Sequence, residues 1–109
     1  MKEPKVSIVI VNYNGKDILR HNLKSISGLN YGNYETIVLD NASTDGSQDF
    51  VKSNFKKIRL IENRENLGYS GINSAIKHCK GDYILFLNND MELEKNSLKE
   101  LVKTVESGK

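Results

Sequence analysis

The sequence predicts an α/β domain with an open, mostly parallel sheet and helices on both faces, in a three-layer α/β/α arrangement. Three observations predict it. Four short apolar runs are rich in β-branched or aromatic residues, as strands buried on both faces of a parallel sheet are. Helical patterns lie between these runs, so strands and helices alternate. The connections are short and no linker or repeat interrupts the chain, so residues 1–109 are expected to form one domain.

The expected strands are the four apolar runs. They cover residues 6–11 (VSIVIV), 36–39 (TIVL), 58–61 (IRLI) and 83–87 (YILFL). We expect the last run to be a central strand beside the first. It ends in two amides and a carboxylate, Asn88, Asn89 and Asp90, which are poor residues for a core. This change predicts that the strand ends in a ligand-binding crevice.

The expected helices are recognised by apolar residues that share one face. The four sets are Ile18, Leu19, Leu23 and Ile26; Phe50, Val51 and Phe55; Ile72, Ala75, Ile76 and Cys79; and Leu98, Leu101, Val102 and Val105. Asp45 can cap the second helix, with Gln48 at its third position, close to a capping box. Asn66 can cap a helix that begins near Gly68, and Gly81 fits the position just after the end of that helix.

Composition excludes several classes of function. The formal net charge is only +2 and no basic cluster is interleaved with aromatic residues, so a nucleic-acid partner is not expected. Cys79 is the single cysteine, which rules out an intrachain disulfide and favours a small buried hydrophobe over a nucleophile. The first apolar run is much shorter than the ~20 residues of a membrane span. We therefore expect a cytoplasmic chain, which a longer parent protein could hold at the inner face of a membrane.

Small, polar and acidic residues follow all four expected strands. Because the carboxyl ends of parallel strands meet at one edge of a sheet, and ligands bind beyond that edge, we expect these residues to form one site. The candidates are Asn12, Tyr13, Asn14, Asp40, Asn66, Gly68, Gly71, Asn88, Asn89 and Asp90.

A nucleoside diphosphate with a metal ion suits these side chains. The carboxylate of Asp40 can accept a hydrogen bond from a base N–H or a ribose hydroxyl. Gly68 and Gly71 allow close approach at a helix start, which favours anions. Asp90 offers a hard oxygen ligand for Mg²⁺ or Mn²⁺, which usually takes one or two carboxylates together with phosphate oxygens.

Each candidate also has a purely structural interpretation, and these stay open. The glycines can serve packing, Asp40 can be a solvated loop carboxylate, and residues 88–90 can be a simple strand-ending turn. Asp45 is interpreted mainly as a helix cap. The chain lacks both a Gly-x-Gly-x-x-Gly sequence after the first strand and a P-loop, which argues against a dinucleotide-binding dehydrogenase or a P-loop NTPase.

Taken together, four segments resemble one family. VSIVIVNYNG, YETIVLDNASTDGS, NLGYSGINSAI and YILFLNNDMEL resemble the N-terminal, nucleotide-sugar-binding half of family-2 glycosyltransferases, whose Rossmann-like fold is called GT-A. The segments stand in family order and at family spacing over about residues 5–105. Asn12-Tyr13-Asn14 and Leu87 to Asp90 look most like rhamnosyltransferase-type members.

The resemblance implies roles for the matching residues. The loop of Asn12, Tyr13 and Asn14 would line the nucleobase pocket, and Asp40 would contact the base or ribose. Residues 66, 68 and 71 would shape the loop beside the sugar nucleotide. Residues 88–90 stand at the place of the family's Asp-x-Asp motif, which implies that Asp90 binds a diphosphate-bound Mg²⁺ or Mn²⁺.

The sequence departs from the family pattern in two ways. Asn88 replaces the first aspartate of the motif, and no residue up to Lys109 is a convincing general base, so the catalytic residues are unassigned. The expected function is the donor-binding part of a metal-dependent, inverting glycosyltransferase. A UDP- or dTDP-sugar would be the donor, and a glycan or lipid-linked acceptor would bind elsewhere. A non-catalytic nucleotide-binding or assembly module is the alternative, and exposed apolar surface would allow self-association.

Overall fold

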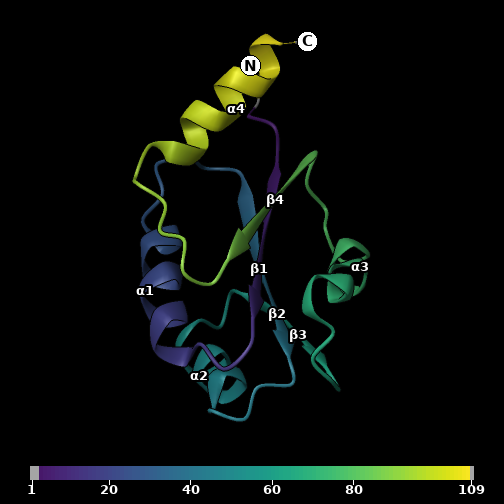
Figure 1. The fold of residues 1–109 in the computed structure, drawn as a ribbon. Coiled ribbons are helices and arrows are strands. Elements are labelled where there is room, and N and C mark those ends of the chain that lie inside the picture. The colour runs from purple at the N-terminus through teal and green to yellow at the C-terminus, as the bar shows by residue number, and fades with distance from the viewer. Residues whose placement is uncertain (1–2, 109) are drawn as a thin grey trace.

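The computed structural model describes residues 3–108, apart from the side chain of Tyr69. In this part of the chain, four parallel strands form one sheet in the order β3-β2-β1-β4 (Figure 1). The strands are β1 (Val6–Asn12), β2 (Tyr34–Asn41), β3 (Arg59–Asn63) and β4 (Tyr83–Asn88). The predicted parallel α/β sheet is confirmed, and each strand lies within two residues of its expected start.

Helices cover both faces of the sheet, so the predicted three layers are also confirmed (Figure 1). On one face lie α1 (Lys16–Ser27), α2 (Ser47–Asn54) and α4 (Ser97–Ser107). On the other lies α3 (Ile72–Ile76), preceded by a 3₁₀ turn, η1 (Gly68–Gly71). No helix among residues 3–108 is long and apolar enough to cross a membrane.

The core is divided by the sheet because successive strand residues point to opposite faces. On β1, Ile8 and Ile10 pack with Leu23 of α1, whereas Val9 packs toward Ala75 of α3. The first cluster is the larger, because three helices contribute to it and only one short helix contributes to the second. All four of these β1 and α1 side chains are completely buried. This division also decides which polar side chains meet at the carboxyl ends of the strands.

The position of β4 differs from the expectation. It lies beside β1, as predicted, but at the edge of the described sheet and not at its centre. Leu85 and Leu87 face the larger core cluster, while Ile84 and Phe86 on the opposite face are 38% and 42% exposed. The continuous apolar run in the sequence suggested burial on both faces, but α3 packs against β1 and β2 and leaves this face of β4 uncovered.

Two helix boundaries differ from the expectation. Helix α2 begins at Ser47 with Gly46 as its N-cap residue, so Asp45 lies one position earlier and Gln48 is not at the third position. Helix α3 ends at Ile76, well before Gly81. Gly81 is instead needed for close approach, since a Cβ there would lie 2.6 Å from the backbone nitrogen of Ser7. The expectation for Asn66 is met, because its Oδ1 accepts from the N–H of Gly68 at 3.0 Å.

Four predicted core-facing residues are exposed, and one of them is Ile76 on α3. The apolar stripes on the first and last helices are narrower than the sequence pattern indicated, because only one line of side chains on each reaches the sheet. Leu19, Leu23, Leu98 and Val102 are buried. The other three exposed residues are Ile18 on α1 and Leu101 and Val105 on α4.

Candidate functional site

The strand register brings the polar strand ends together in pairs. Asn12 at the end of β1 is the register partner of Asp40 on β2, and Asn41 is the register partner of Asn63 at the end of β3. Neighbouring residues of a strand point to opposite faces, so Asp40 and Asn41 join different groups of side chains. Two separate hydrogen-bond networks result, one on the α1 face of the sheet and one on the α3 face.

The first network is centred on the carboxylate of Asp40, which is only 1% exposed. Its Oδ1 accepts from Asn12 Nδ2 at 2.9 Å and from the Ser43 hydroxyl at 2.7 Å, and its Oδ2 accepts from the Ser43 N–H at 2.9 Å. Asn12 Oδ1 in turn accepts from Asn89 Nδ2 at 2.9 Å. The carboxylate, which only accepts, therefore fixes the orientation of both amides and ties the ends of three strands together.

The same network shapes the loop after β1. Ser43 Oγ accepts from the N–H of Asn14 at 2.8 Å, and Asn14 Oδ1 accepts from the N–H of Thr44 at 2.6 Å. Asn14 has a φ of 50° and Ala42 has a φ of 61°, so both adopt the left-handed conformation that asparagine tolerates better than alanine. Two loops from neighbouring strands are thus locked to one another.

Gly15 allows the contact between Asn89 and Asn12. A Cβ at Gly15 would lie 2.0 Å from Asn89 Nδ2 and 2.9 Å from Asn12 Oδ1. The glycine directly before α1 thereby lets the residue after β4 approach β1. Sequence inspection did not identify Gly15 as part of the site.

The second network lies on the α3 face. Asn41, which is 1% exposed, donates through Nδ2 to the carbonyl of Gly68 at 3.1 Å and accepts at Oδ1 from Asn63 Nδ2 at 2.8 Å. Ser74 Oγ lies 2.6 Å from the carbonyl oxygen of Gly71 and 3.2 Å from Asn63 Oδ1. This network joins β2, β3 and α3 to the turn that contains Gly68 and Gly71.

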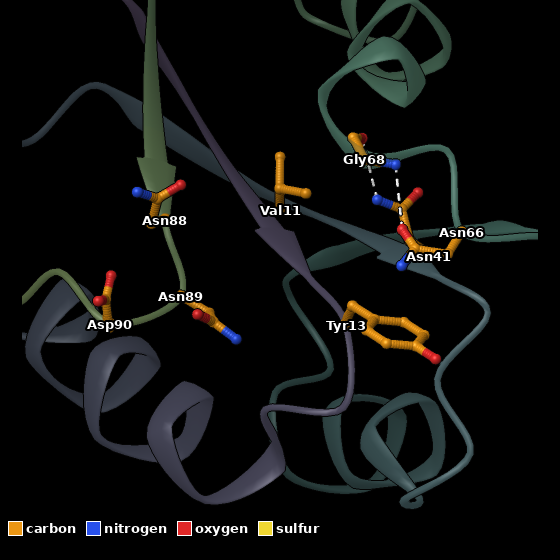
Figure 2. A pocket seen from close by; sticks show the side chains of 8 residues that line it. All are labelled: Val11, Tyr13, Asn41, Asn66, Gly68, Asn88, Asn89 and Asp90. Carbon is orange, nitrogen blue, oxygen red and sulfur yellow. Dashed lines mark hydrogen bonds between the residues drawn. The ribbon is translucent and has the colours of Figure 1, made fainter.

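A pocket of about 290 Å³ opens between the two networks (Figure 2). Residues 88–90, at the end of β4, form one side, and Asn41, Asn66 and Gly68 form the other, with Val11 and Tyr13 between them (Figure 2). Six of the ten predicted site residues line it. They are Tyr13, Asn66, Gly68, Asn88, Asn89 and Asp90.

The other four predicted residues lie outside the pocket lining. Asn12 and Asp40 are buried beneath it, and Gly71 packs against the asparagine pair of the second network. Asn14 lines a neighbouring hollow at the start of α1, together with Asp45. Their predicted contacts with a donor remain predictions.

The predicted metal site fits only an ion whose ligands come partly from the protein and partly from bound phosphate groups. Asp90 is an exposed carboxylate at the pocket wall, and Asn88 and Asn89 add amide groups. Within residues 3–108, no group of three or more histidine, cysteine, aspartate or glutamate side chains is arranged to hold a metal ion. One carboxylate beside an open pocket suits Mg²⁺ or Mn²⁺ that arrives with phosphate oxygens as its other ligands.

Besides Gly15, sequence inspection missed Asn41, Ser43 and Asn63 as contributors to the site. All were visible among the polar residues after the strands, but nothing in the sequence distinguished them from turn residues. A signal was present in the spacing, because Asn12, Asn41 and Asn63 are the last residues of three adjacent strands. Their roles follow from register, which the sequence does not specify directly.

Comparison with known protein families agrees with the fold and the site. The model of glycosyl transferase family 2 matches residues 7–109, which is nearly the whole chain. The chain therefore belongs to glycosyl transferase family 2, and the resemblance noted in the sequence is confirmed.

Two curated relatives and one solved structure illustrate the match. Poly(ribitol-phosphate) beta-glucosyltransferase of Bacillus spizizenii is 39% identical over 79% of this chain and 15% of its own length. UDP-Glc:alpha-D-GlcNAc-diphosphoundecaprenol beta-1,3-glucosyltransferase WfaP of Escherichia coli is 39% identical over 78% of this chain and 35% of its own length. This chain thus spans well under half the length of either relative.

The solved structure supports the fold. The mannosyltransferase PcManGT from Pyrobaculum calidifontis, in complex with GDP-Man and Mn²⁺, superposes with a TM-score of 0.85 at 24% identity. The match covers 94% of this chain and 32% of that chain. The predicted GT-A type of α/β fold is therefore confirmed for nearly all of the chain.

Proposed function

We propose that the chain binds the nucleotide-sugar donor of a glycosyltransferase, in the pocket at the carboxyl edge of the sheet. The main supporting observation is that six separately predicted residues line this pocket. They come from the ends of β1 and β4 and from the segment before α3. Its location beyond the carboxyl ends of parallel strands is where open α/β sheets bind ligands. Membership of glycosyl transferase family 2 supports the reaction class.

The pocket residues suggest a division of roles. Tyr13 is half exposed at the pocket and offers an aromatic face and a hydroxyl to the nucleobase. Asn66, whose Oδ1 accepts from the Gly68 N–H, offers its amide nitrogen to the sugar nucleotide. Asp40 and Asn12 act from below, by holding the ends of β1, β2 and β4 in place.

The metal would be held by Asp90, with Asn88 and Asn89 beside it. A bound Mg²⁺ or Mn²⁺ would offset the negative charge that develops on the nucleoside diphosphate leaving group. The structure of the mannosyltransferase with GDP-Man and Mn²⁺ supports a divalent ion. Asp90 supplies one negative charge at the pocket wall, so the phosphate groups would complete the set of ligands.

We further propose an inverting transfer from a UDP- or dTDP-sugar to a glycan or lipid-linked acceptor. The name of the Escherichia coli relative, which includes a UDP-sugar and a diphosphoundecaprenol acceptor, supports this choice. The acceptor would be bound in the larger protein that the length of the relatives suggests, on the cytoplasmic side of a membrane.

Calorimetric titration with UDP, dTDP and GDP, with and without Mn²⁺, tests the donor role. We expect UDP or dTDP to bind more tightly with Mn²⁺ than without it. In Asp90→Asn, the increase in nucleotide affinity that Mn²⁺ causes should be about tenfold smaller, because an interaction with a charged group is worth about 1.5–3 kcal/mol.

Glu92→Gln is the matched control, because it removes an exposed carboxylate only two residues away. It should leave the effect of Mn²⁺ unchanged. Absence of nucleotide binding by both the chain and any longer protein that contains it would exclude the donor role. Binding by a longer protein that never releases nucleotide from a sugar donor would favour the alternative, a non-catalytic module.

A further inference from the structure

Asn41 lies where β2 meets the turn that forms one side of the pocket. Its side chain is 1% exposed and makes two hydrogen bonds, to Gly68 and to Asn63. Gly68 is also held by Asn66, whose Oδ1 accepts from the Gly68 N–H at 3.0 Å. Both bonds to Gly68 are drawn in Figure 2.

The hydrogen bonds of Asn41 have a fixed direction. The carbonyl of Gly68 only accepts, so the amide nitrogen of Asn41 must face it. The Oδ1 of Asn41 then faces Asn63, which must present its own Nδ2. The orientation of both buried amides is thereby determined by one backbone carbonyl in the turn.

The turn itself requires this support. Gly68 has a φ of 56°, a left-handed conformation that glycine adopts readily. Gly71 closes on the asparagine pair, since a Cβ there would lie 2.7 Å from Asn63 Nδ2 and 3.0 Å from Asn41 Oδ1. A chain segment with two glycines gains backbone freedom unless side chains outside it hold it.

We propose that Asn41 is a positioning residue for the donor, because it fixes the 66–71 turn against the end of the sheet. This inference rests on the proposed donor-binding function, since Asn66 and Gly68 of this turn line the pocket. Asn41 also lines the pocket, but both polar atoms of its side chain are engaged within the protein. Its effect on the donor therefore passes through Gly68.

The sharpest test is Asn41→Asp, which keeps the shape of the side chain. The new carboxylate can still accept from Asn63, but it cannot donate to the carbonyl of Gly68. A carboxylate oxygen would then face the carbonyl oxygen, and both only accept. In NMR relaxation of the nucleotide-free chain, we expect order parameters of the 66–71 amides to fall from ~0.85 to below ~0.6. Amides of β1 should keep their values. In calorimetry, UDP or dTDP should bind about tenfold more weakly, as expected when one buried hydrogen bond is lost.

Two controls separate positioning from general damage. Asn54→Asp makes the same chemical change at an exposed residue of α2, whose Nδ2 donates to the carbonyl of Phe50. Val51→Ala removes buried volume from the larger core cluster, on the face of the sheet opposite the turn. Both should retain wild-type order in the turn and wild-type nucleotide affinity, although Val51→Ala lowers the melting temperature.

The outcomes distinguish the claim that Asn41 holds the turn from the claim that the turn affects donor binding. Unchanged turn order in Asn41→Asp, or equal loosening in Val51→Ala, would overturn the role of Asn41. A looser turn with unchanged nucleotide affinity would overturn the link to the donor. A wild-type chain that binds no nucleotide would instead count against the donor site, while the relaxation data would still decide whether Asn41 holds the turn. If Asn41→Asp does not fold, Asn41→Ser supplies the test, because its hydroxyl adds no charge and is too short to replace the amide.

Discussion

Gly15 illustrates how a single residue without a side chain decides the shape of the site. Asn89 reaches Asn12 only because no Cβ stands between them. The conformation of Gly15 is accessible to other residues, since its φ is −116°. The constraint is therefore the space that Asn89 occupies and not the backbone angle.

Gly15→Ala tests this point. The new methyl group would overlap Asn89, so we expect a loss of about 1–3 kcal/mol in the free energy of unfolding, as for other overpacked sites. Urea unfolding measures the loss. Gly28→Ala is the control, because its Cβ would meet only the carbonyl oxygen of Ser25 at 3.7 Å. Equal stability changes in the two variants would contradict the role assigned to Gly15.

At the scale of elements, Asp45 joins the N-terminal ends of two helices. Its Oδ2 accepts from the N–H of Lys16 at 2.9 Å, at the start of α1. Its Oδ1 accepts from the N–H of Ser47 at 3.0 Å, at the start of α2. The sequence predicted a cap for one helix, whereas the carboxylate satisfies orphan donors of both.

The pKa of Asp45 gives this arrangement a pH dependence. Burial raises the pKa of the carboxyl, but hydrogen bonds from Ser47 and from the N–H of Lys16 outweigh it, so the net pKa lies below its ordinary value of 3.8. A lowered pKa in the folded state stabilises the fold above the unfolded-state pKa. That contribution is lost as the pH falls through the folded-state pKa.

Asp45→Ala should therefore destabilise the chain most at neutral pH. We expect a loss of about 1 kcal/mol at pH 7, the usual effect of removing a capping side chain. The difference in the free energy of unfolding between variant and wild type should narrow below pH 3.8, because the carboxyl is then protonated first in the unfolded state and, at a lower pH, in the folded state. Urea unfolding from pH 7 to pH 3 measures this. A difference that stays constant over that range would show that the carboxylate charge does not matter.

At the scale of the whole molecule, the edge strand β4 exposes apolar side chains, whereas the other edge strand, β3, carries charged residues. Ile84 and Phe86 lie on it, Met91 follows nearby, and all three are exposed. The strand carries no charged residue from Tyr83 to Asn88. Uncharged, apolar edge strands are templates for pairing with another chain.

We predict that the 109-residue chain self-associates through this edge. Sedimentation velocity of the wild type should show a larger average mass as the concentration rises. The variant with Ile84→Lys and Phe86→Lys should remain monomeric, because charges oppose edge pairing. Leu101→Lys, which changes an exposed apolar residue on α4, is the control and should still associate. A wild-type chain that is strictly monomeric at high concentration would refute the prediction.

Much of the fold could be predicted because short-range patterns carry it. The runs around Ile8, Ile37 and Leu85 are apolar on both strand faces, which distinguishes parallel strands from amphipathic ones. The errors arose where packing overrides pattern. The edge position of β4 depends on which elements cover it, and the early end of α3 depends on how the chain returns to Ser7 through Gly81.

The sequence by itself determined the class of the protein, the parallel sheet and the edge at which polar residues gather, because these follow from residue order and periodicity. Only the tertiary structure decided the part that each polar residue plays. Asp40 and Asn41 are neighbours in the chain, yet one anchors Asn12 and the other anchors Gly68. Opposite faces of a strand lead to different partners, and those partners come from strands brought into register by the folded sheet.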